Sequence, residues 1–240
     1  MVRRLYDWTM DLAGRPYALW ALAVISFVES SVFPIPPDVL LIPMILAARQ
    51  RAWLIATVCT LASVAGGIAG YAIVIYNSLV SNRQMVREGW SGIDVQLKRR
   101  TDLIPNLMET VKGYMAHERE TLDAVVNARA KATSAAAAGP EARAKAEGEL
   151  SAALGRLLAI AEAYPDLKAN TTFIEFQTAL QGVEDEIQMA RRYYNGAVRN
   201  LNIQVESFPS NLVANAFKFE QAEYFELENE AERAVPQVKF

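Results

Sequence analysis

The sequence contains few of the side chains that most often build catalytic and metal sites. Its 240 residues include one cysteine, Cys59, and one histidine, His117. A single cysteine excludes a disulfide framework within the chain, and Cys59 lies in an apolar run that is typical of a small packing residue. His117 lies in a polar stretch without a second histidine or a cysteine nearby, so we predict a surface histidine and no metal site.

The chain also has no block of basic residues and no glycine-rich phosphate loop, and its net charge is −3. Without a basic patch, nucleic acid is not an expected partner. No serine or cysteine has a histidine base within a recognisable motif. The acidic run at residues 184–186 is interpreted as a solvated helix face. We therefore predict no enzymatic activity, no cofactor and no metal.

Charge and apolar residues divide the chain into two parts. Up to Val74 it carries five arginines, no lysine and four acids, whereas the rest carries nineteen basic and twenty-three acidic residues. The longest apolar stretches lie in the first part. We predict a membrane segment over residues 1–76 and a water-soluble segment over residues 77–240.

The membrane segment begins with residues 1–14, whose apolar residues recur at helical spacing between charges. This pattern predicts an amphipathic helix at the membrane surface, and a frayed polar terminus is the alternative. Residues 17–33 and 39–48 are apolar but short for a membrane span, and prolines separate them at 34, 36 and 37. No continuous helix passes through such a run. Two short helices with both ends at one surface, a re-entrant hairpin, fit this pattern.

Residues 52–76 carry no charge and are long enough to span a bilayer. Gly66 and Gly70 form a GxxxG spacing, which allows close approach of a second helix. We expect these glycines to pack against the hairpin of the same chain, and homodimerisation is the alternative.

Two carboxylates, Glu29 and Asp38, lie inside the apolar stretch. Ionisable groups at membrane depth are costly and commonly mark functional sites. Both residues are therefore candidates for a transport site. The alternative is that they solvate a turn at the interface.

The soluble segment starts with an apolar stripe at helical spacing. Its members are Leu79, Val86, Trp90, Ile93, Leu97, Ile104, Leu107, Val111 and Tyr114. Arg100 occupies the one missing place in this stripe. Pro105 falls inside it without breaking its phase, which favours a kinked but continuous helix over one restarted at Asp102. The stripe fits the seam of a coiled coil or, preferably, one face of a bundle.

Three further helical signals follow. A helix is expected from about Pro140, with Leu150, Leu154, Leu157, Leu158 and Ala161 on its buried face. Capping-box spacing at residues 172–175 predicts the start of a long helix, which Phe208-Pro209-Ser210 ends. The tail, residues 211–240, is expected to form a short helix and then to fray. No strand alternation is visible. The predicted fold class is therefore all-α, a membrane region followed by a long antiparallel helical bundle.

One motif in the first part is similar to the DedA family, in particular its YqaA-like branch. It comprises Ser26-Phe27-Val28-Glu29-Ser30-Ser31-Val32-Phe33-Pro34-Ile35-Pro36-Pro37-Asp38-Val39-Leu40-Leu41-Ile42-Pro43 and the later Gly66-Gly67-Ile68-Ala69-Gly70-Tyr71. The resemblance covers about the first 74 residues and implies re-entrant hairpins and proton-coupled transport of a lipid or small solute. The acidic motif carries over to Glu29 and Asp38. The family's second half, with its opposing hairpin and arginine motif, is missing. Transport would then require pairing of two chains, because paired inverted repeats surround such sites.

The second part strongly resembles the LemA family over nearly all of residues 75–240. The motifs include Trp90-Ser91-Gly92-Ile93-Asp94-Val95-Gln96-Leu97, Thr101-Asp102-Leu103-Ile104-Pro105-Asn106-Leu107, Ala190-Arg191-Arg192-Tyr193-Tyr194-Asn195 and Phe208-Pro209-Ser210-Asn211. The resemblance implies a bacterial membrane-anchored bundle on the cytoplasmic side, without accepted catalytic residues. It also suggests Asn77, Asp94, Asn106 and Asn195 as buried hydrogen-bonding positions. The two resemblances join near Val74-Ile75, through a natural gene fusion or an engineered one.

Two functions follow from these features. The first is a non-enzymatic bundle in the bacterial inner membrane that assembles with itself or with other membrane proteins. The second is a transporter that acts as a multimer through Glu29 and Asp38. Arginines flank every apolar segment, so the positive-inside rule gives no orientation. A hairpin with a cytoplasmic N-terminus places the bundle outside, whereas the LemA resemblance places it in the cytoplasm, and both remain open.

Overall fold

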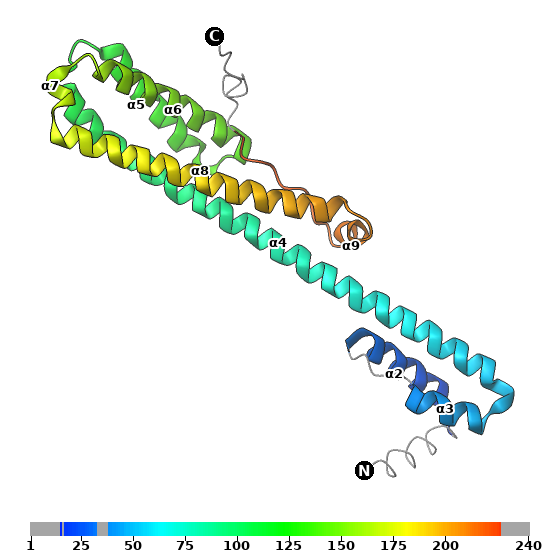
Figure 1. The fold of residues 1–240 in the computed structure, drawn as a ribbon. Coiled ribbons are helices and arrows are strands. Elements are labelled where there is room, and N and C mark those ends of the chain that lie inside the picture. The colour runs from blue at the N-terminus through cyan, green and yellow to red at the C-terminus, as the bar shows by residue number, and fades with distance from the viewer. Residues whose placement is uncertain (1–14, 16, 33–37, 227–240) are drawn as a thin grey trace, which may run out of the picture. The chain divides into compact units, whose positions relative to one another are not determined.

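The computed structural model describes residues 15, 17–32 and 38–226, and every regular element among them is helical (Figure 1). For these residues the expected all-α class is confirmed. The predicted amphipathic helix at residues 1–14, the proline turn at 33–37 and the fraying expected at the end of the tail lie outside the described residues.

The helices follow one another with short connections. They are α2 (Ala18–Val32), α3 (Asp38–Ala47), α4 (Ala52–Lys112), α5 (Arg119–Ser134), α6 (Pro140–Ala161), α7 (Pro165–Lys168), α8 (Thr171–Glu206) and α9 (Ser210–Ala216). Single 3₁₀ turns stand at Arg49–Arg51 and Ala135–Ala137. The chain forms two compact units, Met1–Leu79 with Phe208–Phe217, and Val80–Ser207 with Lys218–Phe240.

In the first unit, α2 and α3 pack on the beginning of α4. Their shared apolar core consists of Ala18, Leu22, Met44, Ile55 and Cys59. The 15-residue α2 is about 22 Å long at 1.5 Å per residue, shorter than the roughly 30 Å hydrocarbon core of a bilayer. Neither short helix is therefore long enough to cross a membrane.

Helix α4 continues for 61 residues and passes through Pro105. The expected continuous helix across Pro105 is confirmed, and the alternative restart at Asp102 is wrong. Proline has no N–H, so the carbonyl of Thr101 four residues earlier loses its helical donor. The side chain of Arg129 on α5 replaces that donor, because its Nε donates to the Thr101 oxygen at 3.0 Å. A side chain from a neighbouring helix thus supplies the hydrogen bond that the proline cannot donate.

The second unit is a bundle in which α5, α6 and α8 pack along α4 (Figure 1). The α4 stripe is confirmed, since Ile93, Leu97, Ile104, Leu107 and Val111 are all buried. Only its last member departs, because the Tyr114 side chain is 41% exposed. The expected start of α6 at Pro140 is also confirmed, and so is its buried face except for Leu158, which is half-buried.

Two local predictions need correction. The capping box at residues 172–175 is wrong, because α8 begins at Thr171 and its N-cap is Asn170. The Asn170 side chain accepts a hydrogen bond from the backbone N–H of Phe173 at 3.1 Å, and asparagine is among the strongest N-caps. The tail does contain a short helix, α9, as expected. The tail was expected to fray after this helix, but residues 219–226 pack as an extended segment instead.

Candidate functional site

The two acidic candidates for transport lie in the hairpin of the first unit. Glu29 is on α2, and its side chain is half-buried. Its Oε2 is buried and has no hydrogen-bond partner within the described part of the chain. Asp38 is the first residue of α3, and its side chain lies outside what the structure describes. No described contact joins the two, so a transport site here stays a prediction.

The two glycines of the GxxxG motif lie against the backbone of α2. A Cβ added at Gly66 would stand 2.2 Å from the carbonyl oxygen of Phe27, and one at Gly70 would stand 2.7 Å from that of Ser31. At Gly67, between them in sequence, a Cβ would meet nothing within 4 Å. Small residues allow helices to approach this closely. The glycine face of α4 is thus covered by a helix of the same chain.

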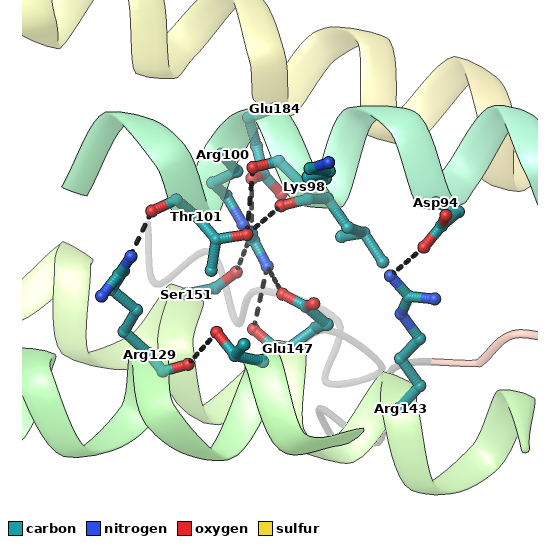
Figure 2. Close-up of polar contacts among 11 residues, drawn as sticks. Asp94, Lys98, Arg100, Thr101, Arg129, Arg143, Glu147, Ser151 and Glu184 are labelled. Carbon is teal, nitrogen blue, oxygen red and sulfur yellow. Dashed lines mark hydrogen bonds and ion pairs between the residues drawn. The ribbon is translucent and has the colours of Figure 1, made fainter. Parts of the chain in front are cut away.

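The second unit contains a buried ionic cluster centred on Arg100 (Figure 2). The Arg100 side chain is 3% exposed, and its Nη2 pairs with Oε2 of Glu147, which is 4% exposed. Its Nη1 donates to Oγ of Ser151 at 2.7 Å and to Oε2 of Glu184 at 2.9 Å. These contacts join α4, α6 and α8 through one guanidinium. Buried charges are tolerated when they are paired and hydrogen-bonded in this way.

A second arginine, Arg143 on α6, makes a parallel set of contacts (Figure 2). Its Nη2 donates to Oδ1 of Asp94 at 2.6 Å, and its Nη1 donates to the carbonyl oxygen of Ala136 at 3.2 Å. Its guanidinium carbon lies 5.5 Å from the centre of the Trp90 ring. Arg143 therefore fastens the start of α6 to α4 by an ion pair and a cation–π contact.

The contacts of the cluster are better suited to fixing the register of the helices than to catalysis. Arg100 faces two carboxylates, and a cavity of about 640 Å³ beside it is lined by residues of α4, α6 and α8. The described residues contain no group of metal ligands. The prediction that His117 lies at the surface is confirmed, because its side chain is exposed. Interpreting residues 184–186 as a purely solvated face is wrong for Glu184, because its carboxylate binds the buried Arg100.

A third arrangement lies along α8, where residues 218–226, here named the strap, run beside the helix. The side-chain amides of Asn195 and Asn202 each form two hydrogen bonds with one strap residue. Asn202 accepts from the backbone N–H of Ala222 at 2.8 Å and donates to its carbonyl at 2.9 Å. Asn195 accepts from the N–H of Phe225 at 2.9 Å and donates to its carbonyl at 3.2 Å. The two asparagines therefore bind backbone groups, which any sequence could supply.

Aromatic side chains hold the strap at both ends. Phe225 is 1% exposed, and its ring centre lies 5.8 Å from that of Trp90. Phe219 is buried under the guanidinium of Arg83, at 4.8 Å from the ring centre. Between them, the Tyr194 hydroxyl donates to the carbonyl of Glu223 at 2.8 Å. Burial, and then the charge of Glu223, raise the pKa of Tyr194 above its ordinary value of 10.0.

Sequence reasoning identified part of this arrangement. Asn195 was expected at a buried hydrogen-bonding position, and it is half-buried and paired with the strap. The same expectation is wrong for Asn77 and Asn106, which are exposed, and for the Asp94 side chain, which is 52% exposed. Asn202 was missed. The available signals were the seven-residue spacing of the two asparagines and the three-residue spacing of Phe219, Ala222 and Phe225.

Comparison with known proteins gives three kinds of match. The model of the LemA family matches residues 89–240. Magnetosome protein MamQ 2 of Paramagnetospirillum magneticum is 28% identical over an alignment of 175 residues, and the match covers 63% of this chain and 64% of that protein. Protein LemA of Metamycoplasma hominis is 28% identical over 138 residues, 58% of this chain and 63% of that protein.

A shorter match has higher identity. An uncharacterized protein of Haemophilus influenzae is 46% identical over 72 residues, which are 30% of this chain and 38% of that protein. The chain thus spans less than two thirds of the length of each of these curated relatives.

Proposed function

This chain belongs to the LemA family, and from that premise we propose that it is a membrane-tethered helical bundle of a bacterial inner membrane. Its proposed role is to assemble with copies of itself or with other membrane proteins, without catalysis. Its proposed partners are the lipid bilayer and these proteins.

The observation that carries this proposal is the change of character along α4. Within the described part of the chain, one helix, α4 with the turn before it, is long and apolar enough to cross a membrane. Only 17% of its most apolar 18-residue window is buried, whereas the core helix of a soluble protein would be mostly buried. Large apolar side chains point outward there: Trp53, Leu54, Leu61, Val64, Ile68, Tyr71, Ile73 and Val74. A bilayer is the solvent that favours such a surface.

An aromatic contact in the first unit supports the same placement. The ring of Tyr76, at the end of the uncharged run, lies 4.8 Å from that of Phe217, measured between centres. Phe217 is 60% exposed, and Phe208 and Leu212 in the same segment are 79% and 61% exposed. Aromatic residues concentrate where the hydrocarbon core of a membrane meets water. The segment around α9 is suited to lie at that level.

The polar cluster supports a structural role for the bundle. Arg100 and Arg143 direct their charges to carboxylates of neighbouring helices. Buried polar pairs of this kind can select one packing arrangement among similar ones. We assign the cluster to bundle register.

The proposal is tested on the full chain extracted in mild detergent. Sedimentation velocity is expected to show an oligomer, or crosslinking of native membranes is expected to capture a protein partner. A protein that sediments as a monomer and yields no crosslinked partner would contradict the assembly role. A protein that stays in solution without detergent would contradict the tether.

The side of the membrane on which the bundle lies is open to direct measurement. Single cysteines replacing Gln50 and Ser81 flank the proposed span. In intact cells, an impermeant thiol reagent is expected to label one of them and not the other. A cytoplasmic bundle predicts that only position 50 is labelled, and labelling of both positions would contradict a crossing between them.

Transport remains a second candidate, favoured by one observation. The Oε2 of Glu29 is buried without a hydrogen-bond partner in the described residues, and an ionisable side chain in an apolar membrane segment commonly marks a functional site. Under the transport hypothesis, Glu29→Gln abolishes proton-coupled flux in liposomes and the parent shows flux. Equal flux in the two proteins, or none in the parent, would reject it.

A further inference from the structure

The strap has the geometry of a bound peptide. Its burial repeats every third residue, because Phe219, Ala222 and Phe225 face the bundle while the residues between them are exposed. A repeat of three is that of an extended polyproline-type segment and differs from the two-residue alternation of a strand. One face of the strap is therefore held by the bundle, and the other faces are free to carry charge.

The spacing of the two asparagines on α8 that bind the strap matches this repeat. Asn195 and Asn202 are seven residues apart, about 10.5 Å along a helix. Their strap partners, Phe225 and Ala222, are three residues apart, about 9–10 Å along an extended chain. The two spacings agree, so both amides reach a backbone N–H and C=O at once. The strap runs antiparallel to α8, since the later strap residue pairs with the earlier helix residue.

The first residue of the strap, which follows directly on the chain before it, has a strained backbone. Lys218 has a φ of 55°, in the left-handed region that residues with a Cβ rarely adopt. Short hinges under strain favour the exchange of the following segment between identical chains. Lys218 can leave this conformation if the strap separates from its own bundle.

The strap lies in a groove formed by Asn195, Asn202 and the residues that cover Phe219 and Phe225. We propose that this groove binds the strap of a second copy of this chain, so that copies join by exchanging straps. A second copy is the expected partner because its strap has the sequence that the groove accepts. The groove accepts two aromatic residues six positions apart with a small residue midway, and the chain's own strap has that sequence. The proposal rests on the assembly role proposed above and names the contact that produces it.

Exchange needs no new interaction, because each groove keeps the same hydrogen bonds with a strap of identical sequence. Its free energy comes from relief of the Lys218 backbone and from tethering in one membrane, which raises the concentration of one copy near another. The exchanged and closed forms therefore differ only at the hinge and in which chain supplies the strap.

The test uses full-length protein in two isotopic forms. A light copy carries the photocrosslinking residue benzoylphenylalanine in place of Tyr224, which is 40% exposed and lines a cavity with Arg192, Gly196 and Arg199 of α8. It is mixed in equal amount with an unmodified heavy copy, reconstituted into vesicles and irradiated. Mass spectrometry then identifies which copy supplies the α8 peptide in each crosslink.

Random exchange predicts that about half of the crosslinks from position 224 reach α8 of a heavy copy. A double variant, Asn195→Ala with Asn202→Ala, is expected to lower the light–heavy and the light–light yields together, on the order of tenfold, because the closed and the exchanged forms lose the same four hydrogen bonds to the strap. The control is Asn200→Ala, an exposed asparagine of the same helix, which leaves the yield unchanged. Circular dichroism establishes that each variant is folded.

Sedimentation of the same samples separates the two proposals. An oligomer whose crosslinks are all light–light overturns strap exchange and leaves the assembly role standing. A monomer with only light–light crosslinks overturns both. In native membranes, crosslinks from position 224 to a different protein in place of a second copy would also overturn exchange, and would identify the groove as a receptor for another protein's extended segment.

Discussion

The two compact units use the same helix in opposite ways. In the first unit, small residues of α4 face its own hairpin and large apolar side chains point outward. Gly66 lies against the α2 backbone, while Leu61 and Ile68 are each 65% exposed. In the second unit the pattern is inverted, because Ile93, Leu97 and Leu107 are buried and charged residues cover the outside. With the proposed membrane placement, one helix follows the packing rules of two solvents.

The difference shows which interactions each solvent leaves available. In a bilayer, outward apolar side chains gain nothing by burial, so close backbone contact at small residues brings helices together. In water, apolar burial drives packing, and a few buried ions select the register. The bundle accordingly places Arg100 within its apolar stripe, whereas the first unit relies on glycines.

The largest expected effect is at Arg100. Arg100→Met leaves the Glu147 carboxylate buried at 4% exposure without its partner, and breaking such a pair typically costs about 3–5 kcal/mol. The free energy of unfolding, measured by denaturant titration of the bundle signal in mild detergent, is expected to fall by that amount.

The matched control is Lys131→Met, which removes an ion pair whose side chains are 64% and 44% exposed. Its expected effect is below about 1 kcal/mol. Equal losses for the two variants would show that burial does not distinguish these pairs.

The second effect concerns the first unit. A Cβ at Gly66 would overlap the Phe27 carbonyl, so Gly66→Ala is expected to push α2 away from α4 at a cost of about 1–3 kcal/mol. Cys59 lies in the core shared by these helices and is 5% exposed, so its reaction with a thiol reagent reports the separation. Faster labelling is expected in Gly66→Ala and unchanged labelling in Gly67→Ala, where a Cβ meets nothing. Identical labelling rates in both variants would argue against close packing of α2.

The third effect concerns the proline in α4. Arg129→Met removes the donor to the Thr101 carbonyl and is expected to cost about 1–2 kcal/mol, because that oxygen loses its partner. In a Pro105→Ala background, the restored N–H of residue 105 can bond to Thr101 itself. The loss from Arg129→Met is then expected to shrink, as a double-mutant cycle on unfolding free energy would measure. Strict additivity would contradict the compensating role of Arg129.

These cases also show how far the sequence predicts the structure. Periodicity identified the α4 stripe and its passage through Pro105, because apolar spacing records burial along one helix. It could not identify the Arg129–Thr101 bond, since the partners are 28 residues apart and belong to different helices. The N-cap of α8 was predicted at Thr172 because Thr172 and Glu175 have the spacing of a capping box, and Asn170 was overlooked.

The candidate sites were predicted less completely than the fold. The gap at Arg100 in the stripe was visible in sequence, but its partners Glu147 and Glu184 come from helices whose relative register no local pattern gives. The strap was expected to fray because its glutamates suggested a solvated tail. Its three-residue burial repeat became meaningful only beside the seven-residue spacing of the asparagines on α8.

The smallest expected effect is a pH dependence at the strap. Because the pKa of Tyr194 is raised in the folded protein, the folded state holds this proton more tightly than the unfolded state. Its contribution to stability is therefore complete below about pH 10 and is lost as the pH rises from there through the raised pKa. Unfolding titrations between pH 9 and 11 are expected to show a steeper loss in the parent than in Tyr194→Phe. Parallel curves would contradict this.

Spin labels at two matched positions on α4 show whether this helix passes from lipid to water. Val64 and Val95 are the same residue on the same helix, 54% and 58% exposed, and each can be replaced by a labelled cysteine in a Cys59→Ser background in vesicles. If α4 leaves the bilayer between these positions, a label at 64 is relaxed mainly by oxygen, which concentrates in lipid, and a label at 95 mainly by a water-soluble nickel complex. Equal access of the nickel complex to both labels would contradict it.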